Sequence, residues 1–255
     1  MPEFFEIEHL SKRFGGLEAV SDFSMHVKKG EFVGLIGPNG AGKSTVFNLI
    51  TGVHPPTSGR VIFDGKDITA MRSYKIAALG IGRTFQLNPL FADYSVLENI
   101  SSSFHLSKTP NLLKIYFNTP SHRKDEARIL EMSMEILKLL GLEKVRDEPA
   151  RNLPHGYQKL LGMARALATR PRLLLLDEPL GGMNPAEIEF TLDAIKKTQG
   201  QGMSILIVEH NMQILDLCDR VVVINFGQKI CEGLPEDVRE NEQVIHAYFG
   251  GDSRA

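Results

Sequence analysis

The sequence predicts an α/β fold: a parallel sheet covered by helices, preceded by an antiparallel β region and interrupted by an inserted α-helical lobe. Two features of the chain support this prediction. In the last third, short and wholly apolar segments alternate with helical ones, which is typical of parallel strands buried on both faces. In the middle, apolar residues recur at spacings of three and four, which indicates amphipathic helices.

The N-terminal part is predicted to form strands. Turn signals such as Lys29-Gly30 separate three short apolar runs, at residues 4–10, 23–27 and 31–36. After a glycine-rich turn, a helix is predicted from about Lys43 to Gly52. Residues 60–64 are predicted to form one more strand, because the turn signal Asp64-Gly65 ends an apolar run there.

The middle of the chain, from about residue 95 to residue 141, is predicted to be helical. Its apolar positions recur at helical spacing: Ile129, Met132, Ile136, Leu137, Leu139 and Leu140. Ser121 stands where a helix N-cap is expected. This segment interrupts the strand–helix alternation. We therefore expect residues 87–159 to form a separate lobe, packed on a core made of residues 1–86 and 160–255.

The last third of the chain supplies three predicted parallel strands, at residues 173–176, 205–208 and 221–224. Asn184 is expected to cap the helix between the first two, with Pro185 in its first turn. Because these strands are wholly apolar, both of their faces must be covered by other elements.

Composition and charge limit the classes of protein to which the chain can belong. The chain has 255 residues, 29 of them basic and 31 acidic, and the lack of a basic excess argues against a nucleic-acid partner. Cys218 and Cys231 lack CxxC spacing, so they predict neither a disulfide framework nor a metal site. The N-terminus lacks the apolar segment of a signal peptide, and no apolar run approaches the roughly 20 residues of a membrane span. Any role at a membrane therefore needs a partner.

A glycine-rich loop matches the phosphate-binding pattern GxxxxGK[ST]. It consists of Gly37, Pro38, Asn39, Gly40, Ala41, Gly42, Lys43, Ser44 and Thr45. Backbone N–H groups can surround a triphosphate only where the chain bends tightly, and glycine permits that bend. The helix that starts near Lys43 aims its dipole and free N–H groups at the phosphates. We expect Lys43 to reach the β- and γ-phosphates of ATP, and Ser44 to bind Mg²⁺.

A second acidic element follows the apolar strand at residues 173–176. The strand ends in Asp177 and Glu178, and it brings them to the carboxyl edge of the sheet, where α/β proteins bind ligands. We expect Asp177 to hold Mg²⁺, directly or through water. Glu178 is expected to act as the general base for the attacking water.

With these two motifs the chain resembles the ATPase subunits of ABC transporters over nearly its full length. The resemblance implies a P-loop NTPase core of the RecA-like type. It implies that Gln86, in RTFQL, contacts Mg²⁺ and senses the membrane partner, and that His210, in IVEH, contacts the γ-phosphate. Residues 183–185 resemble the D-loop, which crosses to a second subunit. Phe14 is expected to stack on adenine, and Val20 to line the same pocket.

The signature segment departs from the family's usual pattern, Leu-Ser-Gly-Gly-Gln. The corresponding stretch runs from Leu153 to Gln158, where Pro154 replaces the serine, His155 replaces one glycine and Gly156 is retained. Because the serine hydroxyl is missing, we expect backbone groups at the start of the following helix to clamp the partner subunit's nucleotide, aided by His155.

Three stretches resemble the branched-chain amino acid uptake ATPase that has the longer helical insert: residues 82–86, 111–123 and 244–250. The resemblance implies transmembrane permease subunits and a second ATPase subunit, in a homodimer or a paralogous heterodimer. It implies, indirectly, a periplasmic or extracellular solute-binding protein, and a peripheral position on the cytoplasmic face of the inner or plasma membrane. The identity of the solute rests on this likeness alone, because such a subunit never touches it.

The role of the helical insert stays open at this level. An apolar cluster, Leu112–Phe117, is flanked by Lys108 and Arg123 and contains Lys114. It faces either the membrane subunit or lipid headgroups, or it packs on the lobe's own core.

Three other functions are compatible with the motifs. One is an ATPase for lipid or lipopolysaccharide export, against which the insert argues. A second is a soluble ABC protein of DNA repair or translation, which usually carries two cassettes or long coiled coils. The third is a nucleotide-binding regulator without hydrolysis, against which Glu178 and His210 argue.

Overall fold

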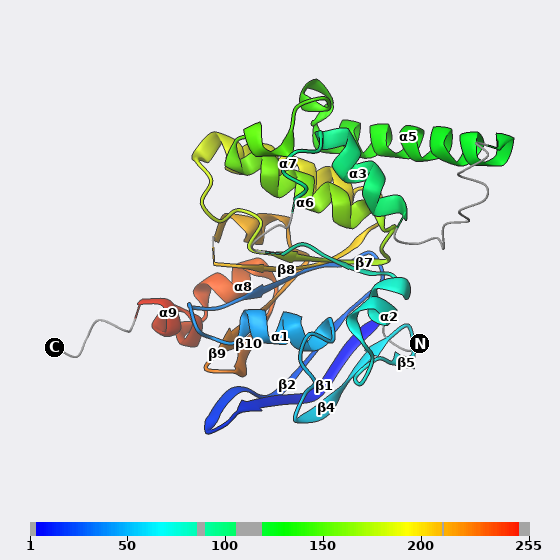
Figure 1. The fold of residues 1–255 in the computed structure, drawn as a ribbon. Coiled ribbons are helices and arrows are strands. Elements are labelled where there is room, and N and C mark those ends of the chain that lie inside the picture. The colour runs from blue at the N-terminus through cyan, green and yellow to red at the C-terminus, as the bar shows by residue number, and fades with distance from the viewer. Residues whose placement is uncertain (1–3, 86–89, 106–118, 211, 250–255) are drawn as a thin grey trace.

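The computed structural model describes residues 4–85, 90–105, 119–210 and 212–249. In Figure 1 a small antiparallel sheet lies at one end of the molecule, a larger sheet in the middle, and a group of helices at the other end. This layered arrangement confirms the predicted α/β fold, with its N-terminal β region and its helical lobe.

The larger sheet has six strands in the order β10-β9-β3-β8-β7-β6. Its strands are β3 (Phe32–Ile36), β6 (Ile81–Arg83), β7 (Leu173–Asp177), β8 (Ser204–Glu209), β9 (Arg220–Asn225) and β10 (Gln228–Gly233). All neighbours pair in parallel except β9 and β10, which form an antiparallel hairpin. The three strands predicted in the last third are β7, β8 and β9, whereas β6 and β10 were not predicted.

The smaller sheet is antiparallel and has the order β2-β1-β4-β5. Its strands are β1 (Phe5–Phe14), β2 (Leu17–Val27), β4 (Ser58–Phe63) and β5 (Lys66–Asp67). The predicted strands at residues 4–10, 23–27 and 60–64 fall within or next to β1, β2 and β4. The observed β1 and β2 are longer because polar residues extend both strands beyond their apolar parts.

Helices surround the larger sheet. They are α1 (Lys43–Ile50), α2 (Ser73–Ala78), α3 (Val96–His105), α5 (Pro120–Leu140), α6 (His155–Ala168), α7 (Pro185–Gln199), α8 (Pro235–Glu240) and α9 (Glu242–Phe249). Short 3₁₀ turns lie at Glu143–Val145, Ala150–Asn152 and Met212–Leu217. Helix α1 lies between the two sheets, and α3, α5, α6 and α7 lie on the opposite side of the larger sheet (Figure 1).

Each central strand contributes to two hydrophobic cores. In β7, Leu173 and Leu175 join the core around α1 and the small sheet, whereas Leu174 and Leu176 join the core under the helical lobe. All four side chains are 0% exposed. Alternate residues of a strand point to opposite faces, so a wholly apolar strand fits only between two covered faces, as predicted.

Helix caps follow one prediction and correct another. Asn184 caps α7, with Pro185 as the first helical residue and a reciprocal capping box to Glu187. Helix α5, however, is capped by Thr119, whose side chain accepts a hydrogen bond from His122 N. The prediction of Ser121 as N-cap is therefore wrong. Pro120 is favoured at the first helical position, so the cap lies just before it.

The helical lobe is packed closely on the core. Helix α6 contacts both α3 and α5, and α5 also contacts α7. The predicted boundary between residues 159 and 160 falls inside α6, which runs without interruption from the lobe into the core. In the described part of the chain, no helix is long and apolar enough to cross a membrane.

Truncating β7 tests the two-sided burial of the sheet. We expect Leu174→Ala to lower the free energy of unfolding by about 2–5 kcal/mol, because it leaves a cavity in a closely packed core. The matched change Leu130→Ala, on α5, removes the same atoms from a side chain that is 50% exposed. It should change stability by less than about 1 kcal/mol. Urea unfolding of both variants measures the difference, and equal losses would contradict the assignment of Leu174 to the core.

Candidate functional site

The phosphate-binding loop joins β3 to α1, and close packing fixes its course. A side chain at Gly37 would put its Cβ 2.1 Å from the carbonyl oxygen of Ile224 in β9, so only glycine fits there. Gly42 caps α1 with a φ of 105°, which lies in the left-handed region that favours glycine. The loop is thus bent around the start of α1, and the N-terminal N–H groups of that helix face into the bend.

Lys43 lies inside this loop. It is 5% exposed, and its Nζ donates hydrogen bonds to the carbonyl oxygens of Gly37 at 2.6 Å and Pro38 at 2.9 Å. Burial lowers the pKa of Lys43, and the carboxylates of Glu178, Glu209 and Asp177 oppose part of that shift. The positive charge is therefore held at the centre of the loop and balanced by acidic groups around it.

A groove of about 400 Å³ runs along the outer side of this loop. It is lined by residues of four parts of the chain: Phe14, Leu17, Glu18 and Ala19 from the β1–β2 hairpin, Asn39–Thr45 from the loop and α1, Glu178 after β7, and Phe226 between β9 and β10. Phe14 is 43% exposed and Phe226 is 85% exposed, so two aromatic rings are available to a planar base. Val20, predicted to line this pocket, is completely buried in the core.

Asp177 is held by a buried ion pair. Its Oδ2 lies 2.7 Å from Arg83 Nη2, and the two side chains are 5% and 8% exposed. Arg83 also donates to Asn48 and Thr51 at the end of α1, at 2.8 and 2.9 Å. Asp177 N donates to Thr84 Oγ1 at 3.0 Å. The aspartate predicted to serve the metal is thus anchored by the strand next to β7.

Glu178 follows directly and has an unusual backbone. Its φ is 46°, a conformation that costs a non-glycine residue about 1–2 kcal/mol. Its N–H donates to Val208 O at 2.9 Å, and it lines the same groove as Lys43 and Ser44. Strained backbone of this kind is concentrated at functional sites.

His210 comes just after β8, whose last residue is Glu209. The Glu209 carboxylate is completely buried: Oε1 accepts from Leu180 N at 2.7 Å and Oε2 from His210 N at 3.0 Å. The imidazole Nδ1 lies 3.7 Å from that Oε2, and the His210 side chain is 51% exposed. Glu209 therefore connects the histidine to the segment that follows Glu178. The groove-lining residues do not include His210.

The residues present fit a magnesium ion that is bound mainly by phosphate and water. No group of three or more His, Cys, Asp and Glu side chains within the described ranges could hold a metal ion, which excludes a metal cage made of those side chains there. Ser44 presents a hydroxyl in the groove, and the Arg83 ion pair engages one oxygen of Asp177. One hydroxyl and one carboxylate are the protein ligands that Mg²⁺ takes beside a nucleotide.

The signature segment differs from the expected arrangement. Gly156 N donates at 3.1 Å to Oε1 of Glu187, in α7 of the same chain, instead of being free for a partner's nucleotide. Gly156 is buried, and a Cβ there would lie 3.0 Å from that oxygen. The ring of His155 bonds through Nε2 to Gly181 O at 3.2 Å. Pro154 and His155 are exposed at the start of α6.

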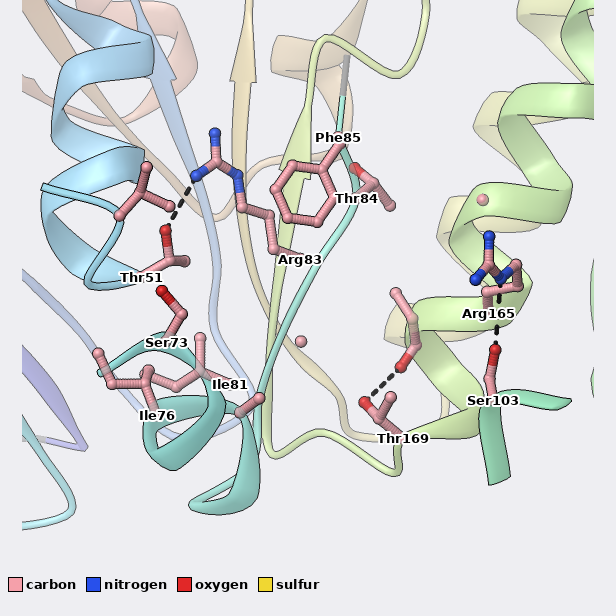
Figure 2. A pocket seen from close by; sticks show the side chains of 15 residues that line it. Thr51, Ser73, Ile76, Ile81, Arg83, Thr84, Phe85, Ser103, Arg165 and Thr169 are labelled. Carbon is pink, nitrogen blue, oxygen red and sulfur yellow. Dashed lines mark hydrogen bonds between the residues drawn. The ribbon is translucent and has the colours of Figure 1, made fainter. Parts of the chain in front are cut away.

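A second pocket, of about 260 Å³, is lined in part by Arg83 (Figure 2). In Figure 2, α1 and α2 form one wall, α6 forms the other, and Arg83 and Phe85 lie between them. Its lining is mainly apolar and small: Thr51, Val53, Ser73, Ile76, Ala77, Ile81, Gly82, Arg83, Thr84, Phe85, Ser103, Gly162, Arg165, Ala166 and Thr169. We call this pocket the lobe groove, because α6, which runs from the helical lobe into the core, lines one side of it.

Two predicted features lie outside the described residues: Gln86 and the apolar cluster at residues 112–117. Phe85, the last described residue before Gln86 in the chain, lines the lobe groove.

Several residues of the site were not predicted from the sequence: Arg83, Glu187, Glu209, Phe226, and Lys159, whose Nζ donates a hydrogen bond to Glu178 O at 3.0 Å. Arg83 and Glu209 lie in RTFQL and IVEH, the segments that contain the predicted residues Gln86 and His210. A charged residue next to an apolar strand is a signal that could have identified them. Glu187 occupies the third position of α7, three residues after Asn184, which is the capping-box spacing. Phe226 and Lys159 carry no pattern of their own.

A glycine-rich phosphate loop between a parallel strand and a helix, with an acidic pair at the end of a nearby strand, defines a P-loop nucleotide-binding protein. Comparison with known families makes this class specific. A family model described as "ABC transporter" matches residues 20–181. Another, described as "Branched-chain amino acid ATP-binding cassette transporter", matches residues 228–253.

Individual relatives agree along nearly the whole chain. The high-affinity branched-chain amino acid transport ATP-binding protein BraF of Pseudomonas aeruginosa is 39% identical, over 96% of this chain and 97% of the relative. The corresponding protein LivG of Escherichia coli is 37% identical over 96% of each. A solved ATP-binding cassette of an ABC transporter, in its ADP conformation, is 31% identical with a TM-score of 0.84, covering 98% of this chain and 100% of that one.

The chain therefore belongs to the ABC transporter family of ATP-binding proteins, and it is an ATPase of that type. Its fold is that of an ABC cassette, as the resemblance implied.

Removing the charge inside the loop tests the nucleotide site. We expect Lys43→Ala to weaken ATP binding by about 10²–10⁴-fold, because losing one partner of a buried charge pair costs about 3–5 kcal/mol. The control Lys124→Ala removes an exposed ammonium from α5 and should leave the affinity unchanged. Isothermal calorimetry with MgATP gives both values, and equal affinities would show that Lys43 does not contact the phosphates.

Proposed function

We propose that this chain is the ATP-hydrolysing subunit of an ABC importer for branched-chain or related amino acids. The observation that supports hydrolysis most directly is that one groove is lined by Lys43, Ser44 and Glu178. This groove therefore brings together a cation that can bind the phosphates, a hydroxyl that can bind the metal, and a carboxylate that can accept a proton.

In the proposed reaction, Lys43 and the N–H groups at the start of α1 hold the phosphates of ATP. The carboxylate of Glu178 accepts a proton from water as its oxygen attacks the γ-phosphorus and the bond to ADP breaks. His210 contacts the γ-phosphate, oriented by Glu209. Bound Mg²⁺, held by Ser44 and Asp177, would neutralise charge on the phosphate oxygens. The role of Gln86 as an additional metal and partner contact stays a prediction.

Adenine is proposed to bind against Phe14, at the end of the same groove. A flat aromatic ring on an exposed strand end offers a stacking surface, and stacking on a nucleobase contributes roughly 1–3 kcal/mol. Val20 is fully buried in the core and does not line the groove, so Phe14 carries this proposal without it.

We infer that two such subunits work as a pair, either identical or paralogous, with each nucleotide between the loop of one and the signature segment of the other. The exposed Pro154 and His155 at the start of α6 support this arrangement. Because Gly156 N is bonded to Glu187, the clamp would use the helix dipole and the exposed first turn, or would require Glu187 to move.

Coupling to membrane subunits is proposed to occur in the lobe groove. Its apolar lining and its position beside Phe85 suit a helix or loop of a permease, and helical partners commonly dock by an apolar face into such grooves. With permease partners, the chain would sit peripherally on the cytoplasmic face of the inner or plasma membrane, and a solute-binding protein outside the cell would deliver the solute.

The choice of solute rests on likeness. The relatives BraF and LivG are described as branched-chain amino acid transport proteins, and the family model for that class matches the segment that contains β10, α8 and α9. Measuring the uptake of labelled leucine in cells that lack this gene tests the proposal. Restored uptake with the native chain, but not with Lys43→Ala, would support it.

The general base can be tested by an isosteric change. Glu178→Gln should slow ATP turnover by about 10²–10⁴-fold, because an amide cannot accept the proton of the attacking water. ATP binding should persist, since the phosphate loop is unchanged. We expect an ATP-dependent dimer, alone or with a paralogous subunit, on size-exclusion chromatography. Near-normal turnover would remove Glu178 as the base.

The lobe groove can be tested with neighbouring alanines of α2. Ala77 and Ala78 are both exposed, but only Ala77 lines the groove. Ala77→Glu should reduce copurification with the membrane subunits at least about tenfold, because a carboxylate would be buried without a partner. Ala78→Glu should copurify normally, and both variants should bind ATP like the native chain. Equal copurification of the two variants would argue for docking elsewhere.

A further inference from the structure

Three contacts fasten the start of α6 to residues 178–187, which run from Glu178 into the first turn of α7. Lys159 Nζ donates to the carbonyl oxygen of Glu178 at 3.0 Å. His155 bonds to Gly181 O, and Gly156 N donates to Glu187, as described above. The three acceptors, at residues 178, 181 and 187, are spread along this segment, so the first turns of α6 hold it along its length.

The Lys159 bond is directed at the most strained residue of the segment. Glu178 is in the left-handed region, where non-glycine residues persist only if the surroundings hold them. Its N–H is fixed by Val208 O, and its carbonyl accepts from both Lys159 Nζ and Gly181 N, the latter at 3.3 Å. The ammonium therefore binds one of the two peptide groups that define the conformation of Glu178.

The surroundings of Lys159 make this bond stronger than an exposed one. The lysine is partly buried, and it lines a small cavity together with Asp177, Thr84 and Phe85. Burial lowers its pKa, while the nearby acids Glu209, Glu178 and Asp177 oppose that shift. A charged donor to a carbonyl in such a setting contributes more than a neutral hydrogen bond does.

We propose that Lys159 is a positioning residue for the catalytic carboxylate: its bond to the Glu178 carbonyl holds the left-handed backbone that aims the side chain into the nucleotide groove. This inference rests on the proposed role of Glu178 as base. Helix α6 begins in the signature segment, which is proposed to contact the partner's nucleotide. Lys159 therefore also connects that segment to Glu178, the proposed base of this subunit.

Hydrogen exchange of the full-length chain tests the positioning directly. In Lys159→Met, amides of residues 178–183 should exchange roughly 10–100-fold faster, because the lost bond to a charged donor is worth about 1.5–3 kcal/mol. Amides of the phosphate loop should exchange at the native rate. The control Lys196→Met removes an exposed ammonium from α7 and should change neither. Native exchange at residues 178–183 in Lys159→Met would overturn the proposal.

Kinetics of the same variants separate positioning from general damage. We expect Lys159→Met to lower kcat at least about tenfold while the affinity for MgATP stays within about twofold of native, because the phosphate loop does not use Lys159. Lys159→Arg keeps a cation and should recover part of kcat and of the exchange protection. If affinity and melting temperature fall together with kcat in both variants, Lys159 serves overall stability and the proposal is wrong.

The two proposals fail separately. Normal turnover by Glu178→Gln would remove the base from the proposed function, yet the exchange rates of residues 178–183 would still decide whether Lys159 holds the segment. Conversely, native exchange in Lys159→Met would reject the positioning role and leave the base assignment intact.

Discussion

Burial of β3, β7 and β8 on both faces is the constraint on which the site depends. The three strands are adjacent and parallel, and pairing sets Ile36 opposite Glu209 and Asp177 opposite Val208. Their carboxyl ends therefore finish at nearly the same height on one edge of the sheet. The phosphate loop, the acidic pair and His210 follow these ends, so a shift of one strand would separate groups that the chemistry needs together.

The charged groups at this edge are stable there because each is compensated. Lys43 is surrounded by carbonyls and faces acidic neighbours, and Asp177 is neutralised by Arg83. Breaking such a buried pair by removing one partner costs about 3–5 kcal/mol. Arg83 also binds the end of α1 and lines the lobe groove. A partner that fills the groove would thus pack against the same guanidinium that holds the aspartate.

The start of α6 shows how an atypical signature is accommodated. Pro154, which stands in place of the usual serine, is the N-cap residue of α6, and the helix has no side-chain cap there. The N–H of Gly156 donates a hydrogen bond to Glu187, and the ring of His155 bonds to Gly181 O. These contacts satisfy polar groups that would otherwise be left unpaired at a helix end. They also make the signature segment and the residues after Glu178 one connected unit within a single subunit.

The sequence by itself determined the α/β plan, the phosphate loop, the acidic pair and the Asn184 cap, because each depends on residues close together in the chain. Apolar periodicity, glycine spacing and capping chemistry act over a few residues and leave a readable pattern. Only the tertiary structure decided that Arg83 pairs with Asp177, that Glu187 occupies the N–H of Gly156, that Lys159 reaches Glu178 and that Val20 is buried. These features depend on residues of different elements. Strand order and helix packing decide which side chains meet, and a single sequence carries no local signal for either.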